Sequence, residues 1–592
     1  MMKTLKKTNK PLVFFFVFVA IVGCDSEMLN LSPYDKISSG NVWGKASLAE
    51  QVVTGVYNNL LNEYGTSSSK LLNWEAFSSV MDPSTMIQNQ YPMLFGGVTS
   101  NTPFFETHWK VFYEGIFRAN DVIANIHKVP DMSENVKARY IAECKFIRAY
   151  YYFRLNALWR GVPVYLEPVE VEDCIRPRSS EEKVWEIIID DLTDCIEEVN
   201  LPDKYPASSS DYGRITKGAA YTLRGKTYLW TKNWNAAQKD FEEVGKMGYS
   251  LFTGGYNNLF TETNERCEEM IFSIQMVELS DYGSARARSY GGALTAGNGY
   301  NTYFMNTKFI DTYENVNGKP FNWDDYLPGY TTMDPKARSV FFLRDNLTSK
   351  EKNSMKTYGA DMNLYLSTGN ETRILAAYQS RDPRLLATAI TPYSKYLGGM
   401  TGSDIEYTYR WPYKGYDSRD PFDYRIAFTN NFMVYPVRKF VPKGQEYVFP
   451  TYNPIDIPVF RYADVLLGLA EALNEQDKVE LAIIEINKVR ERAGVAALNS
   501  NTYTQVSGKE DLRKRIQHER RVEFACEEQV YFDELRWGTW KETKFAEGNG
   551  LLEVWGAPVY QYVWLGDQCL LWPIPAAEKE KNPNLEQNPD WQ

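Results

Sequence analysis

The sequence predicts a mainly α protein in which tetratricopeptide-like helix pairs form a scaffold and a large irregular, loop-rich lobe contains short β-strands. Two observations support this fold class. Over many segments, apolar residues recur at spacings of three and four, which is the period of one helix face. A central stretch of the chain instead has isolated glycine, proline and aromatic residues between short apolar runs.

Six helices are predicted in the first half of the chain, at 47–64, 106–128, 133–159, 182–199, 216–231 and 235–246. The first has Val52, Val56 and Leu60 on one face. Four of the others are bounded by helix-ending residues, namely Pro130, Pro163, Pro202 and Gly248.

Three further helices are predicted at 462–474, 479–493 and 510–527, and a short strand is predicted at 271–274. Gly494 ends the second of these helices. Helix pairs with short links are typical of α-solenoids, although no clean 34-residue repeat is present.

The chain begins with a segment typical of secretory signal peptides. Four lysines precede the apolar run 11–23, which is shorter than the roughly 20 residues that a transmembrane helix needs. Cys24 follows Ile21-Val22-Gly23, and this arrangement resembles a bacterial lipobox, in which the cysteine is acylated. We therefore expect a lipoprotein signal peptide at 1–23 and lipidation of Cys24. The alternative is an ordinary signal peptide with an incidental cysteine.

We expect the mature chain, 24–592, to form a single domain. Its parts are a helical scaffold at about 40–268 and 459–545, an irregular ligand-binding lobe at about 269–458, and an extended C-terminal segment at 546–592. The chain has a net charge of −11 at pH 7, and removal of the lysine-rich leader makes it more negative. Nucleic-acid binding is not expected, because phosphate contacts need a basic face.

No cofactor or metal site is predicted, although the sequence does not decide whether a structural Ca²⁺ ion binds. The three histidines lie far apart in the sequence, which argues against a histidine-based metal site or catalytic triad. The six remaining cysteines show no metal-binding spacing. We favour free buried thiols, while a disulfide in an exported protein stays an alternative for Cys144, Cys174, Cys195, Cys267, Cys526 and Cys569.

Several motifs, taken together and in order, resemble the SusD/RagB family of outer-membrane nutrient-binding lipoproteins. They lie at 24–33, 142–153, 161–163, 213–220, 381–385, 461–467, 487–494, 572–575 and 582–589. The chain departs from the family at Glu528 and Val530, where Gly and Arg are usual. This departure puts a local packing or ion-pair detail in doubt, but not the fold.

The resemblance implies a protein that is not an enzyme. Family members lie at the outer face of the outer membrane over a SusC-like TonB-dependent transporter, to which they deliver oligosaccharides or polysaccharides that bind by aromatic stacking. A RagB-like minority handles peptides, which is one alternative. A surface glycoside hydrolase using carboxylates such as Asp324 and Asp325 is another.

Family positions place ligand contacts in aromatic-rich segments at 74–95, 282–303, 322–330 and 409–416. We predict Tyr91, Tyr290, Trp323 and Tyr326 as ligand-binding residues and no catalytic residues. Removal of Trp323 is expected to weaken binding without changing the melting temperature. Four polar residues lie on the apolar helices, namely Asn120, Glu143, Arg148 and Arg461. We interpret them as structural links between helices, because buried charges need partners, and we interpret the turn 381–384 as a structural contact of a loop.

Overall fold

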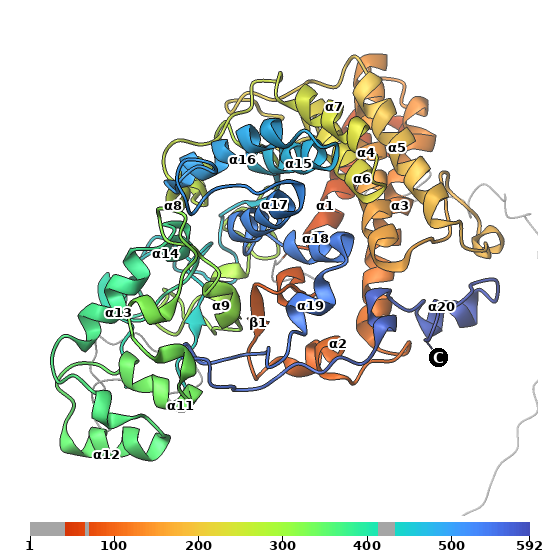
Figure 1. Cartoon of the computed structure of the whole chain (residues 1–592). Coiled ribbons are helices and arrows are strands. Elements are labelled where there is room, and N and C mark those ends of the chain that lie inside the picture. The colour runs from red at the N-terminus through yellow and green to blue at the C-terminus, as the bar shows by residue number, and fades with distance from the viewer. Residues whose placement is uncertain (1–41, 65–69, 413–431, 592) are drawn as a thin grey trace, which may run out of the picture.

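The computed structural model describes residues 42–64, 70–412 and 432–591 (Figure 1). The predicted signal peptide and the predicted lipidation site Cys24 lie outside these ranges. The mainly α fold class is confirmed, because long helices form most of the upper part of Figure 1 and the strands are few and short.

The first group of scaffold helices follows the predicted order. It comprises α1 (Ala46–Asn58), α3 (Pro103–Asn125), α4 (Glu134–Trp159), α5 (Glu181–Glu197), α6 (Lys217–Trp230) and α7 (Trp234–Val244). Side-chain caps set several starts: the Ser180 hydroxyl accepts from Lys183 N at 3.2 Å, and Thr216 accepts from Ala219 N at 3.2 Å. From α3 onward, each helix packs against the next.

The second group completes the scaffold. It consists of α15 (Tyr462–Glu475), α16 (Val479–Ala493), α17 (Lys509–Phe524) and α18 (Val530–Trp537). Helix α15 packs against α7, α16 and α17, so segments more than 200 residues apart lie side by side (Figure 1). The predicted helix at 510–527 is too long. It ends at Phe524, because Cys526 and Glu528 adopt positive φ values of 70° and 62° and turn the chain into α18.

Short strands connect the lobe to the rest of the molecule. Strand β2 (Met270–Ile274) pairs antiparallel with β7 (Ile457–Arg461), which leads directly into α15. A second sheet has the order β1-β3-β6, formed by Met81–Pro83, Tyr303–Met305 and Tyr435–Pro436. A hairpin joins β4 (Lys395–Gly398) to β5 (Ile405–Thr408).

The lobe also contains more helix than the sequence predicts. Its helices are α9 (Arg286–Tyr290), α10 (Thr307–Ile310), α11 (Pro335–Arg338), α12 (Ser349–Tyr358), α13 (Asn370–Gln379) and α14 (Arg384–Thr388). Elsewhere, α2 (Pro92–Phe95), α8 (Tyr256–Leu259), α19 (Trp540–Lys544) and α20 (Ala576–Lys581) are short.

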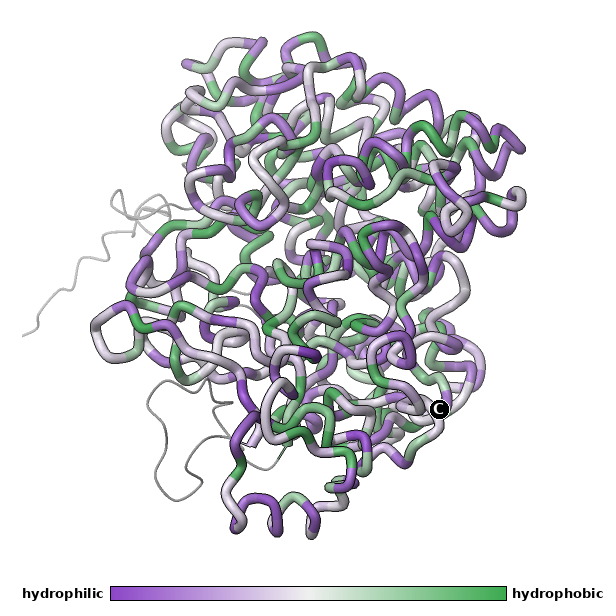
Figure 2. Tube along the Cα trace, turned by 60° about the vertical axis from the view of Figure 1, so that its left-hand side comes forward, coloured by the Kyte–Doolittle hydropathy of each residue, from purple (hydrophilic) through white to green (hydrophobic). Residues whose placement is uncertain are grey.

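One cluster of buried apolar residues extends through the scaffold and the lobe. Along the scaffold helices, hydrophobic and hydrophilic segments alternate, as expected for helices with one buried face (Figure 2). The C-terminal segment closes this core. The Trp572 ring lies 5.2 Å from Trp159 and 5.8 Å from Trp74, and Asn588 Nδ2 donates to the carbonyls of Trp159 and Trp572.

Buried ion pairs tie the helices together. Arg148 Nη2 lies 2.6 Å from Asp191 on α5, and its Nη1 donates to Asn120 on α3. Arg384, in the turn 381–384, lies 2.6 Å from Glu519 on α17. Glu143 on α4 is buried and lies 2.7 Å from Arg214. The interpretation of Asn120, Glu143, Arg148 and the turn 381–384 as structural links is therefore confirmed. The six cysteines of the described residues are free thiols, as favoured, but only four of them are buried, and Cys174 and Cys267 are half-buried.

Candidate functional site: an exposed aromatic surface of the lobe

Two of the predicted ligand residues lie in one buried tyrosine cluster. Tyr91 and Tyr290 both pack edge-on against Tyr303, with ring centroids 6.3 and 5.9 Å apart. The hydroxyls of Tyr91 and Tyr303 are 3.0 Å apart, and Asn73 Nδ2 donates to the Tyr290 hydroxyl at 2.7 Å. Burial raises the pKa of Tyr91 well above its ordinary value, so its hydroxyl stays protonated. Both predicted residues have a packing role, and their contact with ligand stays a prediction.

The other two predicted residues lie in a second cluster. Trp323 is 5 % exposed, and its indole nitrogen donates to Asp311 at 3.1 Å. Its ring packs against Phe321 at 4.9 Å, and Phe321 in turn stacks on the half-buried Tyr326 at 5.7 Å. Burial raises the pKa of the Asp311 carboxyl to about 6. The burial of Trp323 argues against the expectation that its removal leaves stability unchanged.

Exposed rings are found on a different part of the lobe, which we name the aromatic surface and define by Tyr282, Arg288, Tyr300, Phe449 and Tyr452. Tyr282 and Phe449 are each 48 % exposed. The rings of Phe449 and Tyr452 are stacked, with centroids 5.0 Å apart and an interplanar angle of 20°. The Arg288 guanidinium lies over the Tyr300 ring, 4.2 Å from its centroid.

Backbone contacts between two loops build this surface. Ser284 and Asn453 form an antiparallel bridge, with Ser284 N donating to Asn453 O at 2.8 Å. Arg288 N donates to the Pro450 carbonyl at 3.0 Å. Gly283 allows the close approach, because a Cβ atom at this position would lie 2.4 Å from the Tyr452 Cα. The rings of the two loops are therefore held together by main-chain contacts.

Sequence reasoning identified only part of this surface. Tyr282, Arg288 and Tyr300 belong to the predicted segment 282–303, whereas Phe449 and Tyr452 were missed. A signal was present in Tyr447-Val448-Phe449-Pro450-Thr451-Tyr452, where a proline between aromatic residues argues against a central strand. Aromatic residues in such a loop are candidates for a recognition surface.

The aromatic surface has the chemistry of a stacking platform. Flat ring faces pack well against the C–H face of a sugar ring, and the polar tips of tyrosine and arginine can bond to hydroxyl groups. Asn298 lies two residues before Tyr300, in the left-handed backbone region at φ 71°, and its carboxamide is exposed. This arrangement can bind a ligand, and it contains no paired carboxylates.

The carboxylates considered for a hydrolase have local structural roles. Asp324 accepts hydrogen bonds from the Thr331 backbone and side chain, and the side-chain bond helps to lower its pKa below the ordinary value. Asp325 is paired with Lys319 at 2.6 Å. A general acid of a glycosidase needs a raised pKa, so Asp324 is not suited to that role. Within the ranges that the structure describes, no group of three or more His, Cys, Asp or Glu residues could hold a metal ion.

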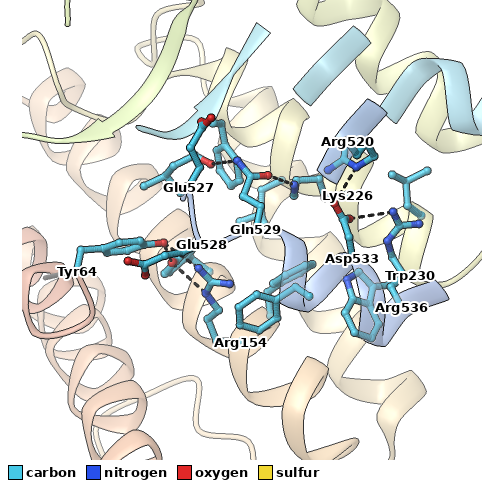
Figure 3. A pocket seen from close by; sticks show the side chains of 17 residues that line it. Tyr64, Arg154, Lys226, Trp230, Arg520, Glu527, Glu528, Gln529, Asp533 and Arg536 are labelled. Carbon is cyan, nitrogen blue, oxygen red and sulfur yellow. Dashed lines mark hydrogen bonds and ion pairs between the residues drawn. The ribbon is translucent and has the colours of Figure 1, made fainter. Parts of the chain in front are cut away.

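A cavity lined by both charged and apolar side chains lies within the scaffold (Figure 3), but its volume of 40 Å³ admits only water-sized groups. Ion pairs and hydrogen bonds cross it, for example from Lys226 to Gln529 and from Arg520 to Asp533. A sugar ring cannot enter this cavity, so we assign it a structural role.

The departure from the family pattern lies at this cavity. Buried Glu528 pairs with Arg286 at 2.5 Å, and its backbone N–H donates to Glu75 at 2.7 Å. Burial raises the pKa of Glu75 to about 8. Val530 is a buried core residue of α18. At the departure, Glu528 thus forms a local ion pair and Val530 packs in the core, and the fold is that of the family.

Comparison with known proteins finds the same family in family models and in individual relatives. A family model described as "SusD family" matches residues 268–591, which is more than half of the chain, and a second, "Starch-binding associating with outer membrane", matches residues 28–229. A SusD-like protein of Formosa agariphila is 26 % identical over 549 residues, covering 90 % of each chain. A SusD-like protein of Bacteroides ovatus is 23 % identical and covers 89 % of this chain and 82 % of its own length.

Solved structures share the fold. A SusD-like carbohydrate binding protein from Bacteroides fragilis has a TM-score of 0.70 at 23 % identity, with 92 % of this chain and 100 % of that chain covered. A laminarin binding SusD-like protein has a TM-score of 0.57 at 20 % identity, with 93 % of this chain and 100 % of that chain covered. From the family match and this shared architecture, the chain belongs to the SusD family.

Proposed function

We propose that this protein is a surface lipoprotein that binds oligosaccharides or polysaccharides by ring stacking and delivers them to a partner SusC-like TonB-dependent transporter. The single observation that carries the binding part is the stacked pair of the exposed Phe449 and the half-buried Tyr452 at the surface of the lobe. Relatives described as carbohydrate binding or laminarin binding support the same ligand class.

The open geometry of the aromatic surface suits a long ligand. A polysaccharide must be able to lie across a binding site without threading its ends into a closed cavity. Exposed rings at Tyr282 and Phe449 meet this need, because each is about half exposed while its loop is fixed by backbone bonds. A pre-formed platform also lowers the entropy cost of binding.

The proposed location is the outer face of the outer membrane, with anchorage through acylated Cys24. The family model whose description includes "associating with outer membrane" supports this location. Among the described residues, no helix has both the length and the apolar character that a membrane span requires.

The binding proposal can be tested with a soluble form that begins after Cys24. Calorimetric titration against neutral glucan oligomers should detect binding, and the double variant Phe449→Ala/Tyr452→Ala should weaken it by about tenfold or more. Tyr503→Ala is a matched control, because Tyr503 is 47 % exposed but lies outside the aromatic surface. Equal affinity of the double variant and the parent protein would disprove the stacking role.

Further arms of the experiment separate the competing functions. Binding of peptides with no binding of any glycan would favour the RagB-like alternative. New reducing ends after incubation with polysaccharides would favour a glycosidase. Co-purification of the full-length protein with an outer-membrane transporter, and loss of glycan uptake after deletion, would support the delivery step.

A further inference from the structure

A second cleft, which we name the scaffold cleft, lies in the helical scaffold and shares no residue with the aromatic surface. Its volume is 430 Å³, within the range of ligand pockets, and it is formed by residues of α6, α15, α17 and α18 together with the turn into α7. Leu229, Ile516 and Asn474 are its most buried lining residues. Leu229 and Arg536 also line the small cavity of Figure 3, so the two spaces are neighbours.

Two tryptophans line the scaffold cleft. Trp234 stands at the first position of α7 and Trp537 at the last position of α18, and both are half-buried. The Trp537 indole nitrogen donates to Glu471 at 3.2 Å, which fixes the orientation of that ring. In the part of the chain that the structure describes, the Trp234 indole nitrogen has no hydrogen-bond partner. The cleft thus presents two large ring systems, one of them with an unused donor.

Both arginines of the scaffold cleft are paired with carboxylates of its lining, whereas Lys232 is exposed at its rim. Arg513 forms a bidentate pair with Glu475, with N–O distances of 2.6 and 2.7 Å. Arg536 Nη2 lies 2.9 Å from Glu471 Oε2. Because each arginine faces a carboxylate, an anionic ligand would meet Glu471 and Glu475, and a cationic ligand would meet the arginines. Neutral ligands with both donors and acceptors avoid either conflict.

Unsatisfied polar groups show where such a ligand could bond. Asn474 is fully buried; its Nδ2 donates to the Lys509 carbonyl at 3.1 Å, while its Oδ1 has no partner among the described residues. This oxygen has almost no accessible surface, so a ligand hydroxyl reaches it only if the Asn474 side chain shifts; an unpaired buried acceptor costs roughly 1–3 kcal/mol, which favours such a shift. The half-buried carboxamide of Gln517 adds a donor and an acceptor to the same lining.

We propose that the scaffold cleft is a second binding site, which takes one or two units of a neutral saccharide between Trp234, Trp537 and the paired arginine–glutamate groups. The ring faces provide stacking, and the ion pairs present adjacent donors and acceptors to vicinal hydroxyl groups. This site does not depend on binding at the aromatic surface.

The test uses fluorine NMR of the soluble mature protein labelled with 5-fluorotryptophan. Trp234→Phe and Trp537→Phe assign the two resonances among the 15 tryptophans of the chain. The probes are maltohexaose, laminarihexaose, cellohexaose and mannohexaose, with an oligogalacturonate, a chitosan hexamer and tryptic casein peptides for comparison. We expect at least one neutral hexasaccharide to shift both resonances saturably at concentrations up to about 10 mM, which reveals millimolar dissociation constants.

Variants make the result specific. In Trp234→Ala, the dissociation constant obtained from the Trp537 resonance should rise by about tenfold. In Gln517→Ala, it should rise by a smaller factor. The double variant Phe449→Ala/Tyr452→Ala should leave both resonances and their titration unchanged. A result that contradicts binding at the aromatic surface can therefore be told apart from one that contradicts binding in the scaffold cleft. No saturable shift with any neutral hexasaccharide, or shifts only with charged probes or with peptides, would overturn the proposal.

Discussion

Arg461 Nη1 lies 2.6 Å from Glu523 Oε1, and neither side chain is exposed to solvent. Arg461 also pairs with Glu269 and Glu527, each at 2.7 Å, and so connects the end of β7 to α17 and to the start of β2. Burial alone would raise the pKa of Glu523, but the nearby arginines Arg492, Arg461 and Arg384 outweigh burial and hold that pKa below its ordinary value. This buried ionic centre is where the scaffold and the lobe meet.

Replacement of Arg461 by methionine should destabilise the protein by about 3–5 kcal/mol, because several buried carboxylates lose their partner. The measurement is urea unfolding followed by circular dichroism. Lys395→Met is the control, since Lys395 and its partner Glu406 are both largely exposed and should contribute less than about 1 kcal/mol. A change for Arg461→Met as small as that of the control would contradict a stabilising role of the buried centre.

Replacement of Trp323 by alanine should cost about 3–5 kcal/mol of unfolding free energy, because it removes a buried ring and leaves the Asp311 carboxyl without its donor. Tyr282→Ala is the comparison, since an exposed ring should change stability by no more than about 0.5 kcal/mol. If Trp323→Ala unfolded at the urea concentration of the parent protein, its ring would have to be a surface residue.

Replacement of Gly283 by alanine should disturb the aromatic surface, because the added Cβ would lie 2.4 Å from the Tyr452 Cα and force the two loops apart. We expect glycan affinity to fall by about tenfold, as measured by calorimetric titration. Gly97→Ala is a suitable control, because a Cβ there meets no atom within 4 Å. Unchanged affinity in Gly283→Ala would show that the spacing of the loops does not matter for binding.

Replacement of Glu553 by glutamine should stabilise the protein at alkaline pH. The Glu553 carboxyl is buried and accepts hydrogen bonds from the Tyr358 hydroxyl and the Trp555 indole, and burial raises its pKa to about 7. A carboxyl with a raised folded-state pKa favours folding below its unfolded pKa of about 4.5, and this contribution is lost as pH rises to about 7.

The neutral amide of Glu553→Gln can still accept from both donors. The stability difference between variant and parent should therefore shift by about 1–3 kcal/mol in favour of glutamine between pH 5 and pH 8, as urea unfolding at each pH would report. A difference that does not vary with pH would show that Glu553 titrates normally.

The scaffold could be predicted from the sequence because each long helix has its own local signals. Helix α4 begins after the cap Ser133 and ends at Trp159, before the left-handed Arg160, close to the predicted bounds. The turn after α17 could not be predicted, because Cys526 and Glu528 adopt positive φ without being glycine. Only contacts such as the buried pair of Glu528 with Arg286 hold that conformation.

The site was harder to predict, because ring exposure depends on distant partners. Tyr290 and Tyr300 lie in the same predicted segment, yet Tyr290 is covered through contacts with Asn73 and Tyr303, whereas Tyr300 stays half-buried beside Arg288. Phe449 and Tyr452 are placed by their contact with a loop more than 150 residues earlier. Composition and periodicity carry no information about such long-range covering.

The closure of the tryptophan core by Trp572 and Asn588 also sets the order of events during biosynthesis. Trp572 supplies the ring that seals α3 and α4, so this part of the core cannot close before residues 572–588 have left the ribosome. A polypeptide that stops before Trp572 would keep that apolar face uncovered, so premature stop codons just upstream of this position should give products that are degraded instead of accumulating as shortened, working copies.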